Sequence, residues 1–216
     1  MLLKSVAMSA IGFFFGSLMV SYFLPKVIKG VDVREVIDGD GNPGSSNAIL
    51  AAGLKIGLFC MALDVLKAFI PVYIAIRFLN IGGFYLVPVM LSPVLGHAFS
   101  PFLGFRGGKA ISTIFGSLLA VFPISHIVLL LAVTMAFYRF VVVIQPDSAG
   151  VIASMITAAA AALFLEPVAF IKLAFVAMGL VVIYKVQGSP NPGDTRVSVW
   201  RYTFSFQKDG LRFHKI

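Results

Sequence analysis

The sequence predicts an all-α fold: a polytopic membrane domain of seven transmembrane helices, with six as the alternative count. The first observation behind this prediction is composition. Hydrophobic residues make up 59% of the 216 residues before the 20 glycines are added, and charged residues 12%, whereas a soluble domain has roughly 45–50% apolar residues with glycine included and about 25% charged residues. This composition excludes a soluble enzyme and a disordered chain, and the single cysteine, Cys60, excludes a disulfide scaffold.

The second observation is that short polar segments divide the chain into apolar stretches. The first stretch, 5–24, has the roughly 20 residues that a bilayer requires, ends at Pro25, and lacks the short apolar region and cleavage site of a signal peptide. The second, 48–78, is too long for one simple span. The others are expected at 82–103, 109–122, 124–143, 149–165 and 168–184. The fourth is short, so a half-helix there would reduce the count to six.

The third observation is where the positive charges lie. An outside N-terminus and a cytoplasmic C-terminus put most of them on the cytoplasmic side, in agreement with the positive-inside rule. These residues are Lys26, Lys29, Arg34, Arg106, Lys109, Arg139 and the cations of the tail. Most of the net charge of +8 is therefore explained by membrane topology, and no nucleic-acid partner is expected. We predict one membrane domain, 1–184, and a polar basic cytoplasmic tail, 185–216, whose alternating aromatic residues indicate a short strand or a segment against anionic lipid.

The loop after the first stretch invites comparison with a calcium site, because Asp38, Asp40 and Asn42 occupy alternate positions. A calcium loop needs Gly at its sixth position and Glu at its twelfth, and Pro43 and Ile49 stand there instead. Calcium is excluded, and the chain has no Cys/His cluster of the kind that binds metal, so neither a metal nor another cofactor is expected.

What remains of this loop is a glycine-rich turn directly before a helix expected to begin near Ala48. Ser45, Ser46 or Asn47 can cap that helix, and the amides of its first turn attract anions. A plain capped turn is the alternative that the residues alone leave open.

A second segment, 96–113, leaves one apolar stretch through His97 and enters the next through Arg106, Gly107, Gly108 and Lys109. Its spacing is not that of a Walker A loop. Two glycines nevertheless let backbone amides approach an oxyanion, and the two cations and the following helix supply positive charge. The segment is a candidate phosphate site.

Asp64 and Lys67 lie three residues apart, on one helical face within apolar sequence. A lone charge there is costly, so we expect a structural ion pair. A transport role for these two charges is the weaker alternative.

Together these segments resemble one family, the bacterial acyl-phosphate:glycerol-3-phosphate acyltransferases of the PlsY type. The likeness covers about residues 15–113. It rests on three segments: Gly30-Val31-Asp32-Val33-Arg34 with Gly39-Asp40-Gly41-Asn42-Pro43-Gly44-Ser45-Ser46-Asn47, then Asp64 to Lys67 with Pro71-Val72, then Gly96-His97-Ala98-Phe99 to Thr113.

The resemblance implies a seven-helix enzyme of the bacterial cytoplasmic membrane, acting in phospholipid synthesis. Its partners would be acyl phosphate, glycerol 3-phosphate or another polyol, and membrane lipids. Arg106, Gly107, Gly108 and Lys109 would bind a phosphate, and Asn42, Ser45, Ser46 and Asn47, with Arg34 nearby, would form the opposite wall. His97 would orient a loop or a phosphate, and Asp40 would act as a general base or bind a polyol.

The chain also departs from the family's pattern. Asp40 replaces a serine, Leu50 replaces an arginine, Ala110 replaces a glycine, and the third motif after the last helix is not found. These departures keep open a second hypothesis, a non-catalytic relative that serves as a lipid-binding or scaffold subunit.

Overall fold

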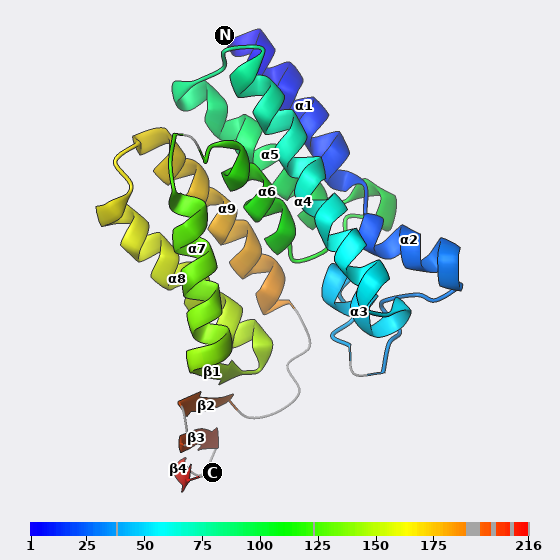
Figure 1. Cartoon of the computed structure of the whole chain (residues 1–216), viewed down its shortest axis with the longest axis vertical. Coiled ribbons are helices and arrows are strands. Elements are labelled where there is room, and N and C mark those ends of the chain that lie inside the picture. The colour runs from blue at the N-terminus through cyan, green and yellow to red at the C-terminus, as the bar shows by residue number, and fades with distance from the viewer. Residues whose placement is uncertain (38, 123, 189–194, 200–201, 208–209, 216) are drawn as a thin grey trace.

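The computed structural model describes residues 1–37, 39–122, 124–188, 195–199, 202–207 and 210–215. A bundle of helices carries a small sheet at the end opposite the N-terminus (Figure 1). Among the described residues, five helical segments are long and apolar enough to cross a membrane: Leu2–Lys29, Leu54–Arg77, Gly83–Leu103, Asp147–Leu165 and Ala169–Gln187. Two shorter apolar helices, Ile111–Ala120 and Ile127–Val141, join them. The predicted helical body with several spans is confirmed, and the count of seven stays a prediction.

The first apolar stretch folds as two helices, α1 (Leu2–Ser17) and α2 (Val20–Lys29). The prediction of one helix ending before Pro25 is wrong. Side chains from elsewhere in the fold satisfy the carbonyls freed by the break at Leu18: Ser100 Oγ donates to the Ser17 carbonyl at 2.7 Å, and Lys67 Nζ donates to the Leu18 carbonyl at 2.6 Å. Past Pro25, α2 continues until a left-handed glycine ends it.

The stretch judged too long for one span is likewise two helices, α3 (Ser45–Ala52) and α4 (Leu54–Arg77). Gly53 separates them with φ 90°, a conformation that residues with a Cβ rarely adopt. A Cβ at Gly57 would overlap Ile49, so a glycine is needed where α3 folds back on α4.

The third span contains the 3₁₀ turns η1 (Gly83–Tyr85) and η2 (Pro101–Leu103) around α5 (Leu86–Ala98). It packs closely on α1, because a Cβ at Gly16 would overlap the backbone of Pro93 and one at Gly96 would overlap the backbone of Phe13. Small residues that let two helix backbones approach are the usual solution for helix packing inside a membrane.

The remaining helices complete the body: α6 (Ile111–Ala120), α7 (Ile127–Ala136) with a π-helical end η3 (Phe137–Val141), α8 (Asp147–Leu165) and α9 (Ala169–Gln187). Buried Glu166 joins two connections of this half, since it accepts hydrogen bonds from the Ser125 hydroxyl and, at 2.9 Å, from the Val168 amide. The largest apolar core runs through this half and α5, with Phe175, Met178 and Leu131 fully buried.

A four-stranded antiparallel sheet corrects the all-α prediction. β1 (Val142–Gln145) pairs with β2 (Thr195–Val199), followed by β3 (Tyr202–Gln207) and β4 (Gly210–Lys215) in sequential order. The alternating aromatic residues of the tail have the period of two that a strand requires, and the interpretation of this segment as a strand is confirmed. Within this sheet, β2 of the tail pairs with β1, which lies between η3 and α8.

Candidate functional site

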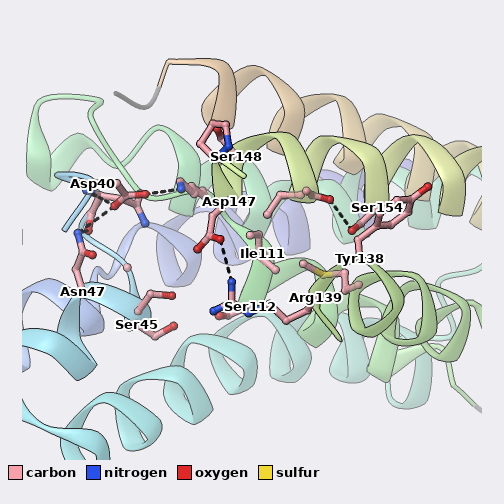
Figure 2. Close-up of a pocket in the computed structure, with 18 of the residues that line it drawn as sticks. Asp40, Ser45, Asn47, Ile111, Ser112, Tyr138, Arg139, Asp147, Ser148 and Ser154 are labelled. Atoms are coloured by element: carbon pink, nitrogen blue, oxygen red, sulfur yellow. Dashed lines mark hydrogen bonds and ion pairs between the residues drawn. The ribbon is translucent and has the colours of Figure 1, made fainter. Parts of the chain in front are cut away.

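The loops at the sheet end of the bundle surround one cavity of about 1040 Å³. Figure 2 shows Asp40 and Asn47 at one end of it and Tyr138 and Ser154 at the other. The structure brings most of the predicted site residues to this cavity: Asp40, Asn42, Ser45, Ser46, Asn47, Asp64, His97 and Lys109. Residues that are more than 60 positions apart in the sequence therefore share one site.

The amino ends of three helices converge on the cavity. Gly44 and Ser45 of α3, Ile111 and Ser112 of α6, and Asp147 at the start of α8 all line it. Each such end carries partial positive charge and unpaired amides. The arrangement suits a ligand with more than one anionic group.

The predicted side-chain cap of α3 is wrong. The helix begins at Ser45, with Gly44 as its N-cap residue and without a capping side chain. The side chain of buried Asn47 turns back into the preceding loop, where Nδ2 donates to the Asn42 carbonyl at 2.9 Å and to Asp40 Oδ1 at 3.1 Å. These bonds fix the glycine-rich loop against α3.

Asp40 forms an ion pair with Lys109 at the edge of the cavity and accepts a further hydrogen bond from the Asn42 amide at 3.1 Å. Partial burial alone would raise the pKa of the Asp40 carboxyl. The hydrogen bond and the charge of Lys109, together with the Asn42 and Asn47 donors, outweigh burial and hold this pKa below its usual value. A paired carboxylate with a lowered pKa is a poor general base.

Gly107 and Gly108 are packed against His97. A Cβ at Gly107 would overlap the His97 carbonyl and one at Gly108 would overlap the His97 ring, while the Gly108 amide donates to the His97 carbonyl at 3.0 Å. The Gly108 amide is therefore used inside the protein, which corrects its predicted place in a phosphate nest. His97 is 3% exposed, borders the cavity, and holds the loop that presents Lys109.

Asp64 and Lys67 form an ion pair at 2.7 Å, with both side chains buried. Lys67 also holds the Leu18 carbonyl, and the Ser21 hydroxyl donates to Asp64. His97 Nδ1 lies 3.9 Å from Asp64 Oδ1 and has no hydrogen-bond partner among the described residues. The network connects the break between α1 and α2 to the floor of the cavity.

Two predicted cations lie apart from the residues that line the cavity in the described structure. Arg34 lies 4.6 Å above the Tyr22 ring and bonds Asp32, with the shortest contact at 2.6 Å. These hydrogen bonds lower the pKa of Asp32 and raise that of Arg34. Arg106 is exposed on the loop after α5. Arg34 is held by a local carboxylate, which its sequence spacing of two residues from Asp32 could have indicated.

Several cavity residues were missed by sequence reasoning. Tyr138 and Arg139 lie in the π-helical end of α7, and Arg139 forms an exposed ion pair with Asp147 at 2.9 Å. Arg196 reaches the cavity on β2, opposite Gln145 in the register. Their sequence signal was weak because the π-helical turn and the pairing of β1 with β2 have no local motif.

Among the described lining residues, three carboxylates (Asp40, Asp64 and Asp147) face three cations (Lys109, Arg139 and Arg196). The formal charges of these six side chains cancel. Asp147 lies in the first turn of α8, so the amino ends without an acidic side chain in their first turn are those of α3 and α6. Among all the residues that the structure describes, no group of three or more His, Cys, Asp or Glu side chains could hold a metal ion.

Comparison with known proteins agrees with the resemblance seen in the motifs. Glycerol-3-phosphate acyltransferase 2 of Thermotoga maritima is 44% identical over 107 residues, which are 49% of this chain and 53% of that protein. Glycerol-3-phosphate acyltransferase of Aquifex aeolicus is 38% identical over 121 residues, 56% of this chain and 62% of the relative. The chain thus spans little more than half the length of the curated relatives it matches.

The solved structures extend the likeness to most of the fold. The glycerol 3-phosphate form of PlsY, an integral membrane glycerol 3-phosphate acyltransferase, superposes with a TM-score of 0.73 and 29% identity over 85% of this chain and 88% of that chain. Its lysophosphatidic acid form gives 0.69 and 26%, over 84% and 87%. The model of a family described as glycerol-3-phosphate acyltransferase matches residues 6–191. With that match over most of its length, the chain belongs to the glycerol-3-phosphate acyltransferase family.

Proposed function

We propose that the chain is a membrane acyltransferase that transfers a fatty acyl group from acyl phosphate to glycerol 3-phosphate, or to a related polyol, in phospholipid synthesis. The observation that carries this proposal is the meeting of three helix amino ends and Lys109 on one cavity. Both substrates carry phosphate groups, and helix ends with a lysine bind such groups well. Apolar lining residues such as Leu50 and Met61 suit the first part of an acyl chain.

In this proposal the phosphate of one substrate binds Lys109 and the amino end of α6. Asn47 lies beside Lys109, since both bond the Asp40 carboxylate, and it shares that phosphate, whereas Asn42, Ser45 and Ser46 bind the other polar group. His97 acts as a positioning residue, because it packs against Gly107 and Gly108 and so fixes where Lys109 lies. Substrate alignment of this kind supplies much of the rate when the acyl donor is already activated.

The reaction needs no covalent enzyme intermediate. A hydroxyl oxygen of the acceptor attacks the carbonyl carbon of acyl phosphate and forms the new ester bond. The bond from that carbon to the phosphate oxygen then breaks, and the hydroxyl proton leaves with the released phosphate. The amides and the lysine around the cavity stabilise negative charge that develops on the carbonyl oxygen and on the leaving phosphate.

The orientation that suits this function is seven crossings of a bacterial cytoplasmic membrane, with the N-terminus outside. An odd number of crossings puts the two termini on opposite sides of the membrane. In keeping with this, the N-terminus lies at the end of the bundle away from the C-terminal sheet and the cavity loops (Figure 1). Phosphorylated substrates are cytoplasmic, and the cavity would then face them. The non-catalytic alternative has less support, because a scaffold does not require helix ends and a lysine gathered on one cavity.

The test is turnover of purified protein in nanodiscs with acyl phosphate and a panel of acceptors, glycerol 3-phosphate first. We expect Lys109→Met to lower kcat/KM by about 100-fold or more, the usual effect of removing one stabilising donor. Lys4→Met is the matched control. Lys4 is exposed in the first turn of α1, away from the cavity, so this variant should leave turnover unchanged. A wild-type protein that consumes no acyl phosphate with any acceptor would contradict the proposal and favour the scaffold hypothesis.

A further inference from the structure

The Asp40 carboxylate occupies a ready-made anion site. It accepts hydrogen bonds from the Lys109 ammonium, from the Asn42 backbone amide at 3.1 Å and from Asn47 Nδ2 at 3.1 Å. A lysine, a backbone amide and a carboxamide are the same donors that hold a phosphate oxygen. The chain therefore fills this site with its own side chain.

The donors and the carboxylate differ in how firmly they are held. Asn47 is 3% exposed in the first turn of α3, and Lys109 is fixed behind by His97 through Gly108. Asp40, in contrast, lies in a loop between Gly39 and Gly41, and Gly41 has φ 70°. Glycines on both sides give this one residue the backbone freedom to leave while Lys109 and Asn47 stay in place.

We propose that Asp40 is a built-in competitor for phosphate: a substrate phosphate group takes Lys109 and Asn47 by displacing the Asp40 carboxylate, which returns when the phosphate leaves. The inference rests on the proposed function in assuming that phosphate binds at Lys109. It adds that Asp40 determines how tightly that phosphate is bound. No covalent bond changes, because one anion replaces another on Lys109 and Asn47.

The consequence for the reaction is weaker binding of phosphate, both when the substrate binds and when the product leaves. Substrate binding must offset the loss of the ion pair between Asp40 and Lys109, which raises KM. The Asp40 carboxylate displaces the released phosphate from Lys109, which speeds product release. A cavity whose formal lining charges cancel fits this moderate affinity.

The experiment measures inhibition of acyl transfer by inorganic phosphate in the wild type, Asp40→Asn and Asp40→Ser. We expect the inhibition constant to fall by about tenfold or more in both variants, because the freed ammonium no longer has to exchange partners. Glu35→Gln is the matched control. It removes one negative charge from the same loop at an exposed residue that lies apart from the cavity lining, and should change the constant by less than about twofold.

A second measurement uses the wild type alone, in case the variants fold poorly. Hydrogen exchange at the Asn42 amide should speed up when inorganic phosphate is added, because phosphate takes Lys109 and Asn47 while the departing Asp40 carboxylate leaves the Asn42 amide without its acceptor. An unchanged inhibition constant in both Asp40 variants, or an unchanged Asn42 exchange rate at saturating phosphate, would overturn the inference. If Lys109→Met still abolishes phosphate inhibition in that case, the proposed function stands. Inhibition that ignores Lys109→Met would count against phosphate binding at Lys109 itself.

Discussion

Two carboxylate–lysine pairs lie near one another in this molecule and serve different ends. Asp64 and Lys67, 2.7 Å apart, are 1% and 6% exposed, and both have further partners in the Ser21 hydroxyl and the Leu18 carbonyl. Asp40 and Lys109 are 33% and 14% exposed and border the cavity. The first pair is buried among helices, and of its two members only Asp64 borders the cavity. The second joins a glycine-rich loop to a helix end, where a ligand can replace one member.

The largest effect should come from breaking the enclosed pair. Lys67→Met leaves Asp64 as an unpaired charge in the apolar body and frees the Leu18 carbonyl. We expect a loss of about 3–5 kcal/mol in the free energy of unfolding. The measurement is the monodisperse fraction and the thermal unfolding of detergent-solubilised protein. Lys55→Met, an exposed lysine on the same helix, should stay within about 0.5 kcal/mol of the wild type.

A second variant separates a lost ion pair from poor packing. Asp64→Asn combined with Lys67→Met removes both charges, and should recover a large part of the stability that Lys67→Met loses. If the single variant is as stable as the Lys55 control, the enclosed pair does not hold the break between α1 and α2.

The next effect concerns the support of the cavity pair. Gly108→Ala places a methyl group against the His97 ring, so the loop must shift and Lys109 with it. We expect turnover to fall by about tenfold or more, since small displacements of a positioned group are costly in rate, while unfolding changes by about 1–3 kcal/mol. Gly82→Ala is the control, because nothing lies within 4 Å of the Cβ it would add. Equal turnover in the two variants would mean that His97 does not set the position of Lys109.

The smallest effect is expected at a third pair, Arg139 and Asp147, whose side chains are 63% and 70% exposed. Water screens such a pair, so Arg139→Gln should change the free energy of unfolding by less than about 1 kcal/mol. Thermal unfolding beside the Lys67 variant checks this ranking. A loss as large as that of Lys67→Met would show that exposure does not explain the difference between the pairs.

Local sequence predicted the parts of this site that depend on local spacing. Asp64 and Lys67 lie three residues apart on a helix, which brings their side chains to one face. The glycine-rich loop and the Gly107-Gly108 segment could be recognised from their composition. The break at Leu18 was not predicted, because the side chains that satisfy its freed carbonyls, Lys67 and Ser100, lie 49 and 83 residues away from their acceptors. The preference of Asn47 for the loop over a capping role also depends on a distant partner, since Asp40 is held in turn by Lys109.

The pairing of β1 with β2 has a consequence for how the protein is made. Arg196 lines the cavity on β2, beside Gln145 of β1, whereas the helix ends that form the rest of the site precede α9 in the chain. A nascent chain inserted only as far as α9 would have those helix ends in place and would still lack this wall. Arg196 can therefore join the cavity only after α9 has been translated, and we expect a ligand that contacts Arg196 to bind chains that include β2 more tightly than shorter ones.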